Sequence, residues 1–237
     1  MDNAMIKNII KLIVLFCLIL IARSAFAVTG TVTSTYNIYD TEATYAAVRD
    51  STQGSNDSSS GPKVGQTTAY RVYRGYLNVT IPALASCTSA YLYLYGDGDN
   101  STTDFEIMAY LGQWSGTVSS AEWELWDGWT SGSAHTGTTF IDIGEWSTSS
   151  YVIGWNIIEL NAAGRAAVLA AQGGTLMIAL ISKEDTDYDA PSNDEYVSFD
   201  GLGDEKAPYL RINDPIGGGG SGSSSLEGAS LEGAKIE

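Results

Sequence analysis

Two short segments of the chain concentrate the carboxylate side chains that bind calcium well. Calcium takes about six to eight oxygen ligands, and aspartates at alternate positions can converge on one ion when a loop curls. These aspartates are Asp97, Asp99 and Asp104 in the first segment, and Asp185, Asp187, Asp189 and Asp194 in the second. Their spacing differs from that of the EF-hand loop, so each segment is either a different kind of structural calcium site or a solvated acidic loop. We predict calcium as a structural cofactor.

Three tyrosines, Tyr91, Tyr93 and Tyr95, alternate with apolar residues in a second stretch that could bind a ligand. Residues two apart on a strand share a face, so the three rings should point to the same side of a sheet. Flat rings can stack on the apolar faces of sugars when polar groups lie nearby. The alternative is that these tyrosines cover the sheet beneath the tryptophan-rich connection of residues 114–129, or beneath a short helix.

Support for catalysis is weak in this sequence. The chain has one histidine, His135, and the residues around it form neither a nucleophilic triad nor a zinc-binding cluster. Paired carboxylates of the kind used in glycoside hydrolysis remain open, because acidic residues are plentiful and their separation in space is not visible in a sequence. We predict a non-catalytic protein, and keep a glycoside hydrolase or lyase as the third possibility.

The elements that must position these side chains are mostly β-strands. Residues 70–82 and 90–95 alternate apolar and polar positions, which predicts two central strands paired as a hairpin, with Pro82 ending the first. Residues 44–50 predict a further short strand, and residues 183–195 an acidic loop. We therefore predict an all-β protein, an antiparallel jelly-roll β-sandwich.

Two stretches late in the chain depart from simple alternation. The alanine-rich residues 162–171 predict the one short helix of the fold, ended by Gly173 and Gly174. Residues 175–182 are nearly all apolar, which predicts a strand buried on both faces.

The two ends of the chain differ from its middle. Residues 1–27 resemble a secretory signal peptide, with lysines, then an apolar run, then a cleavage site at Ala25-Phe26-Ala27. An uncleaved anchor helix is the alternative. Residues 28–214 form the predicted sandwich domain, in which Cys87 is the only cysteine, so no disulfide can form within it. After it, residues 215–237 hold a Gly/Ser linker and a tail.

The sequence resembles two known families. Residues 74–77, 81–82 and 90–95, together with the closing stretches 195–199 and 207–212, resemble DNRLRE-type secreted β-sandwich domains. That resemblance implies a jelly-roll domain of an extracellular protein, similar in fold to carbohydrate-binding modules, although fold does not fix function. The tail holds Ser-Leu-Glu-Gly-Ala twice and resembles the opening of a pentapeptide-repeat segment; a truncated repeat domain, an idle tail and an engineered linker all remain open.

Charge narrows the choice of partners. The formal net charge of −16 repels phosphate backbones, so we predict no nucleic-acid partner. After cleavage of the signal peptide we also predict no membrane contact. The expected function is a secreted structural or adhesive module of the cell surface or an extracellular assembly, stabilised by calcium. It would bind polysaccharide or like subunits, and a carbohydrate-binding module is the alternative.

Overall fold

The computed structural model of this chain describes residue 11 and residues 27–57, 61–129, 132, 142–203 and 206–214. The predicted signal peptide, apart from residues 11 and 27, lies outside the described residues. The predicted tail and His135 also lie outside them. Predictions that concern those parts of the chain therefore stay predictions.

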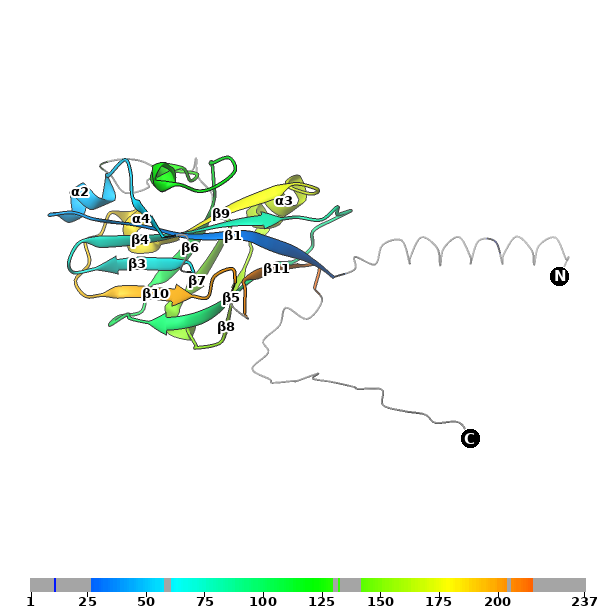
Figure 1. Cartoon of the computed structure of the whole chain (residues 1–237). Helices are drawn as coiled ribbons and strands as arrows, with labels where there is room; N and C mark the ends of the chain where they lie inside the picture. The colour runs from blue at the N-terminus through cyan, green and yellow to red at the C-terminus, as the bar shows by residue number, and fades with distance from the viewer. Residues whose placement is uncertain are drawn as a thin grey trace, which may run out of the picture.

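The described residues form a predominantly β structure (Figure 1). The strands are β1 (Val28–Thr41), β2 (Ser55–Asp57), β3 (Lys63–Thr67), β4 (Arg71–Thr80), β5 (Ala90–Asp99), β6 (Glu106–Leu111), β7 (Gly144–Ser147), β8 (Trp155–Glu159), β9 (Thr175–Ser182), β10 (Glu195–Phe199) and β11 (Tyr209–Ile212). The α-helices are α2 (Tyr45–Arg49), α3 (Ala162–Ala170) and α4 (Lys183–Asp187). Short 3-10 helices are η1 (Ser120–Glu124) and η2 (Thr148–Ser150).

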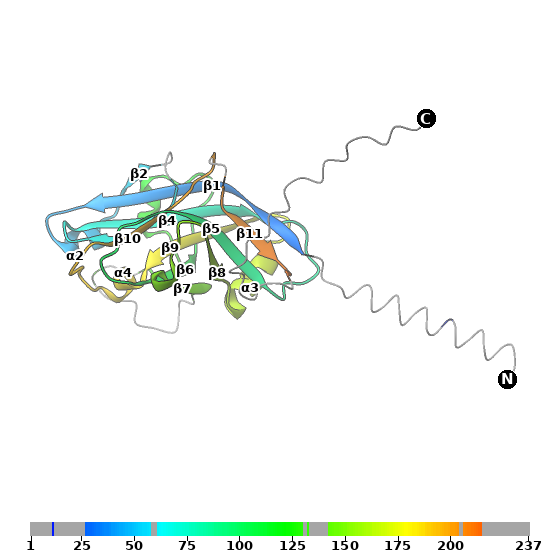
Figure 2. The same cartoon turned by 90° about the horizontal axis from the view of Figure 1, so that it is seen from below.

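The strands form two layers that are joined at their edges. The first layer holds β1, β4, β9, β6 and β7, with β2 beside β1, and the second holds β11, β5, β10 and β8. β1 pairs with both β4 and β11, and β3 pairs with both β4 and β10, so each of these strands links the layers (Figures 1 and 2). Every pairing is antiparallel. The predicted all-β antiparallel sandwich is confirmed.

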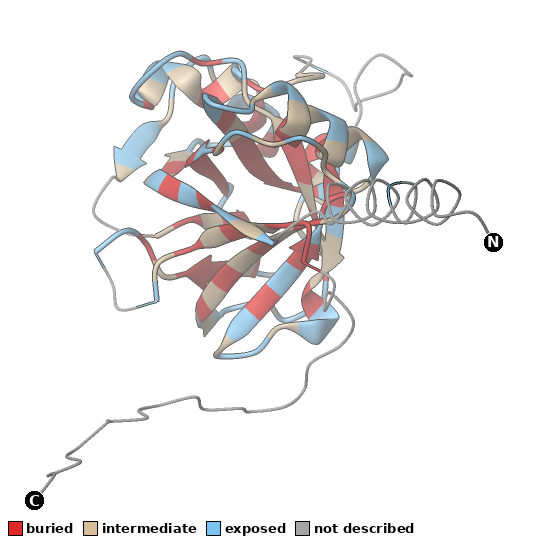
Figure 3. Ribbon diagram, turned by 90° about the vertical axis from the view of Figure 1, so that its right-hand side faces the viewer, coloured by how far each residue is buried: buried red, intermediate tan, exposed pale blue. Residues whose placement is uncertain are grey.

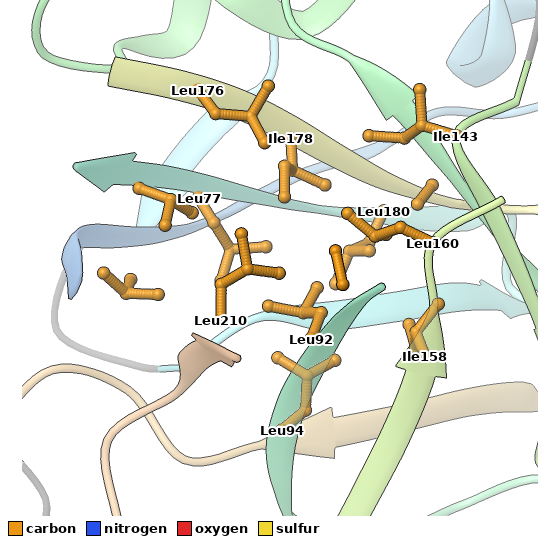
Figure 4. Close-up of a cluster of buried hydrophobic side chains, with 14 of the residues drawn as sticks. Leu77, Leu92, Leu94, Ile143, Ile158, Leu160, Leu176, Ile178, Leu180 and Leu210 are labelled. Atoms are coloured by element: carbon orange, nitrogen blue, oxygen red, sulfur yellow. The ribbon is translucent and has the colours of Figure 1, made fainter. Parts of the chain in front are cut away.

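An aliphatic core fills the space between the layers (Figure 4). Leu77 reaches it from β4, Leu92 and Leu94 from β5, and Ile178 and Leu180 from β9, and each of these residues is fully buried. Burying one such side chain stabilises the fold by about 1.5–3 kcal/mol. We call this cluster the inner core.

The predicted hairpin of residues 70–82 and 90–95 is wrong, although both segments are strands. β4 pairs with β1, β3 and β9, whereas β5 pairs with β8, β10 and β11. The two strands instead face each other across the inner core. Alternation in a sequence identifies the buried face of a strand, but it does not identify the strand's neighbours.

β9 is buried on both faces, as predicted, because a second core lies on the outer side of the first layer. Ile178 and Leu180 enter the inner core, while Ala179 and Ile181 point the other way. The second cluster, which we call the outer core, includes Tyr76, Trp114, Trp123 and Trp126 among its buried members. The tryptophan-rich connection and α2 cover it, and Figure 1 shows both on the outer side of β4.

The sequence predicted one short helix, but the described residues contain three α-helices. α3 lies where it was expected, capped by Asn161. Residues 44–50, predicted as a strand, instead form α2, because the Thr44 hydroxyl caps the helix N-terminus by accepting from the Ala47 amide. The start of the predicted acidic loop is the helix α4, capped by Ser182, with two acidic residues in its first turn.

Candidate functional site

Tyr91, Tyr93 and Tyr95 lie on the outer side of the second layer, and they remain partly exposed. Their strand alternates regularly, since Ala90, Leu92 and Leu94 fill the inner core. Figure 3 shows this alternation of buried and more exposed positions along the strands. The tryptophan-rich connection packs on the other layer, so the expectation that it covers these tyrosines is wrong.

Neighbouring strands add aromatic and apolar residues to the same surface. Antiparallel pairing places Trp155 of β8 opposite Tyr95, and both Ile157 of β8 and Tyr209 of β11 opposite Tyr93. Directly paired residues in an antiparallel sheet point to one face, so these side chains stand beside the tyrosines. We call this surface the open face; its members are Tyr91, Tyr93, Tyr95, Trp155, Ile157 and Tyr209.

The rings of the open face contact one another. Tyr93 and Tyr209 stack with their centroids 4.7 Å apart and an interplanar angle of 9°. Trp155 stands edge-on to both Tyr95 and Tyr209, with centroid distances of 5.3 Å and 5.1 Å. Such offset and edge-to-face contacts are favourable beyond area burial, so the rings hold one another in place. Trp155 nevertheless remains 39% exposed.

Polar groups stand at both ends of the open face. At one end the Lys206 ammonium donates to the Tyr95 hydroxyl at 2.7 Å and lies 3.9 Å from the ring centroid. At the other end Glu159 and Arg211 pair with Tyr91 from either side. An apolar group of rings with polar neighbours can stack on a sugar and accept hydrogen bonds from its hydroxyls.

The structure brings the two acidic segments together. The Thr102 amide donates to the Asp194 carbonyl at 2.8 Å, and the Asn100 amide to the Tyr196 carbonyl at 3.0 Å. The Thr103 hydroxyl also donates to Glu195 Oε1 at 2.8 Å. The turn after β5 therefore lies beside the start of β10, which the sequence did not reveal.

Asp185 has arginine partners. Arg74 Nε lies 2.7 Å from Asp185 Oδ2, and Arg74 Nη2 donates to Oδ1 at 2.9 Å. Arg49 Nε lies 3.1 Å from Oδ1. All three side chains are at most 1% exposed. Asp185 is thus a buried partner of two guanidinium groups on the outer-core side and does not lie in an exposed acidic loop.

The other predicted calcium ligands are exposed, and several of them accept hydrogen bonds from nearby residues. Asp99 accepts from Ser101, Asp97 from Ser198, and Asp194 from both the amide and the hydroxyl of Thr68. Asp104, Asp187 and Asp189 are also exposed. Within the described ranges no three histidine, cysteine, aspartate or glutamate side chains gather as a metal site. Calcium binding at the predicted aspartates stays a prediction.

Sequence reasoning missed a second aromatic group. Tyr39, Tyr73 and Tyr196 stand in one row across the sheet, with Gly65 between the last two. Gly65 has a φ of 126°, and a Cβ there would meet the Glu195 carbonyl oxygen at 1.9 Å, so only glycine fits. The ring centroids of Tyr73 and Tyr196 are 5.0 Å apart. The two rings lie beside Arg71 and line a hollow of about 300 Å³. The three tyrosines are far apart in the sequence, so no sequence pattern predicts that they form one row.

Sequence reasoning also missed the grouping of three polar residues at α4: Glu184 in its first turn, and Gln66 and Glu195 beneath it. Gln66 and Glu195 are buried, and within the described residues Gln66 Oε1 and Glu184 Oε2 have no hydrogen-bond partner. Burial raises the pKa of Glu184 to about 7. The charge of Glu195 is the next largest cause that raises this pKa. Glu184 and Glu195 both fall in the predicted acidic loop of residues 183–195. The sequence did not show their proximity to Gln66, because that depends on how β3, β10 and α4 meet.

Comparison with known proteins adds no family or relative. No protein-family model matches the chain, and no curated protein sequence matches it. The resemblance to DNRLRE-type domains therefore stays a prediction. Across the part of the chain that the structure describes, none of the helices is long and apolar enough to cross a membrane. The open face is the feature from which we infer a function.

Proposed function

We propose that this chain is a secreted, non-catalytic adhesive module whose open face binds an extracellular polysaccharide. The observation that supports the proposal is the group of contacting rings around Trp155, which stays partly exposed on a sheet whose opposite side is fully buried. Exposed aromatic groups of this kind on soluble proteins mark interaction surfaces.

A sugar chain fits the chemistry of this surface. Aromatic faces attract the C–H groups of a pyranose, and the row from Tyr95 to Tyr91 follows the strand direction, so successive sugar units can contact successive rings. Lys206 and Glu159 at its two ends can donate to and accept from sugar hydroxyls. Because the rings already brace one another, little side-chain entropy is lost on binding.

A second copy of the chain is the other candidate partner. In the turn before β8, Val152 and Ile153 are 51% and 66% exposed, and Ile157 on β8 is 39% exposed. Exposed aliphatic side chains gain more from burial against another protein than from contact with a sugar. A structural role in an extracellular assembly would use this surface for association between like subunits.

Retention on insoluble polysaccharides tests the proposal. Cellulose, chitin and xylan serve as probes, and Trp155→Ala should reduce retention at least tenfold because it removes the central ring. Leu125→Ala is the matched control, since Leu125 is 36% exposed but belongs to the tryptophan-rich connection of the other layer.

Sedimentation velocity over a range of protein concentrations tests the second candidate. If Trp155→Ala abolishes self-association and leaves polysaccharide retention unchanged, the partner is a second copy. If the wild-type chain neither binds the polysaccharides nor associates, or if both variants behave alike in each assay, the open face is not a binding surface.

A further inference from the structure

Two buried side chains from different strands face each other beneath α4. Gln66 of β3 pairs directly with Glu195 of β10 in the antiparallel ladder. Such partners point to the same face, with Cβ atoms about 5 Å apart. Gln66 is 1% exposed and Glu195 is 8% exposed. The amide and the carboxylate are therefore buried side by side, and we call the region around them the space beneath α4.

Glu184, in the first turn of α4, borders the same space. α4 packs against β3, the strand that carries Gln66. Asp189 ties the segments to each other, because its amide donates to the Glu184 carbonyl at 2.8 Å and its carbonyl accepts from Gln66 Nε2 at 3.2 Å. The Gln66 amide is thereby fixed with its oxygen directed away from that bond.

The polar atoms in this space that lack a hydrogen-bond partner are acceptors. Gln66 Oε1 and Glu184 Oε2 are buried and accept no hydrogen bond within the described residues. Glu195 Oε1 accepts from the Thr103 hydroxyl, which leaves its second oxygen for another partner. The charges that act on Glu184 most strongly are all carboxylates. Buried acceptors without donors are unfavourable unless a cation or a donor reaches them.

We propose that this space binds one calcium ion, with Glu184, Glu195 and the Gln66 side-chain oxygen as protein ligands and water completing the shell. Calcium accepts carboxylate and amide oxygens in irregular arrangements and is often partly hydrated, whereas magnesium demands a tighter octahedral shell. The inference deepens the structural calcium role expected from the sequence. It moves the site from the predicted aspartates to two glutamates of the same acidic stretch and to Gln66 of β3.

Such an ion would have a structural effect. β3 and β10 form one of the two links between the layers, and α4 continues from β9 of the first layer. A cation held by all three elements would join the layers at this edge, where the two acidic segments also meet. It would stabilise the folded state by mass action, since the ligands come together only on folding.

Calcium titration of the purified full chain by calorimetry, together with thermal unfolding in calcium and in chelator at equal ionic strength, tests the site. The wild-type chain should bind one calcium and unfold at a higher temperature in calcium. Glu184→Gln should weaken calcium binding at least tenfold and abolish the thermal shift. Glu42→Gln is the matched control with the same chemical change: the Glu42 side chain is exposed and follows β1, and this variant should retain both responses.

Gln66→Met provides an independent variant. It keeps the side-chain length but removes the amide, and with it both the oxygen and the Nε2 bond to the Asp189 carbonyl. It should also weaken calcium binding. The proposal is overturned if the wild-type chain shows no calcium binding, if Glu184→Gln and Gln66→Met bind as wild type does, or if Glu42→Gln loses the response. Polysaccharide retention is measured separately by the open-face assay, so a failure of the calcium site leaves that proposal standing.

Discussion

The outer core and the open face use the same kinds of side chain on opposite sides of the sandwich. In the outer core, Trp123 and Trp126 are at most 1% exposed, because the connection that carries them folds over β4, β6 and β9. On the open face, Trp155 is 39% exposed, and its ring contacts neighbours on the same sheet surface. Among the described residues, therefore, the chain covers one aromatic surface and leaves the other partly exposed.

Ion pairs and guanidinium–ring contacts hold the segments that cover the outer core. The Arg74 guanidinium lies 3.9 Å from the Trp123 ring centroid and donates to the Trp123 carbonyl at 2.9 Å. The Arg49 guanidinium lies 3.9 Å from the Trp129 ring centroid. Asp185 pairs with both arginines, so α2, β4, α4 and the tryptophan-rich connection meet at one buried ion cluster. The open face instead relies on contacts between its rings and on the Lys206 contact with Tyr95.

The largest expected effect comes from removing the centre of that cluster. Asp185→Ala leaves two buried guanidinium groups without their shared carboxylate, and should lower the free energy of unfolding by about 3–5 kcal/mol. Chemical denaturation measures the loss. A change below about 1 kcal/mol would mean that the cover is held by its apolar contacts and that the ion cluster contributes little.

A smaller effect is expected from one hydrogen bond beneath the cover. The Tyr76 hydroxyl donates to the Trp123 carbonyl at 3.0 Å, and Tyr76 is fully buried in the outer core. Tyr76→Phe removes the donor but keeps the ring, so it should lower the free energy of unfolding by about 0.5–1.5 kcal/mol. The Arg74 bond to the same carbonyl limits the loss. A loss as large as that of Asp185→Ala would contradict this ranking.

The smallest effect on stability is expected on the open face. Trp155→Ala removes a partly exposed ring, and its free energy of unfolding should fall by no more than about 1 kcal/mol, although binding is lost. The same denaturation series serves as the measurement. If Trp155→Ala destabilises the fold by several kcal/mol, the ring is structural and the loss of binding would no longer identify a binding surface.

The sequence predicted which face of a strand is buried better than it predicted which strands pair with each other. Alternation in β5 correctly separated Leu92 from Tyr93, and the apolar run of β9 correctly indicated burial on both sides. It could not show that β4 and β5 lie in different layers, because strand pairing depends on the whole topology. Local signals also misled where capping by Thr44 and Ser182 favoured helices over a strand and a loop.

The candidate sites likewise contain residues that the sequence predicted and residues that it did not. The tyrosines of the open face were predictable because they lie on one strand, but Trp155 and Tyr209 come from strands that pair with it only in three dimensions. Asp185 looked like its neighbours in sequence, yet Arg49 and Arg74 lie more than a hundred residues away along the chain. Long-range pairing of this kind leaves no local pattern.

Oxidative footprinting of tryptophan, read by mass spectrometry with and without bound polysaccharide, tests the central comparison most directly. In the free protein Trp155 should be modified readily, while Trp123 and Trp126 stay protected beneath their cover. In the bound sample Trp155 should become protected and the other two should not change. Equal reactivity of Trp123 and Trp155 in the free protein, or an unchanged reactivity of Trp155 in the bound sample, would contradict the account.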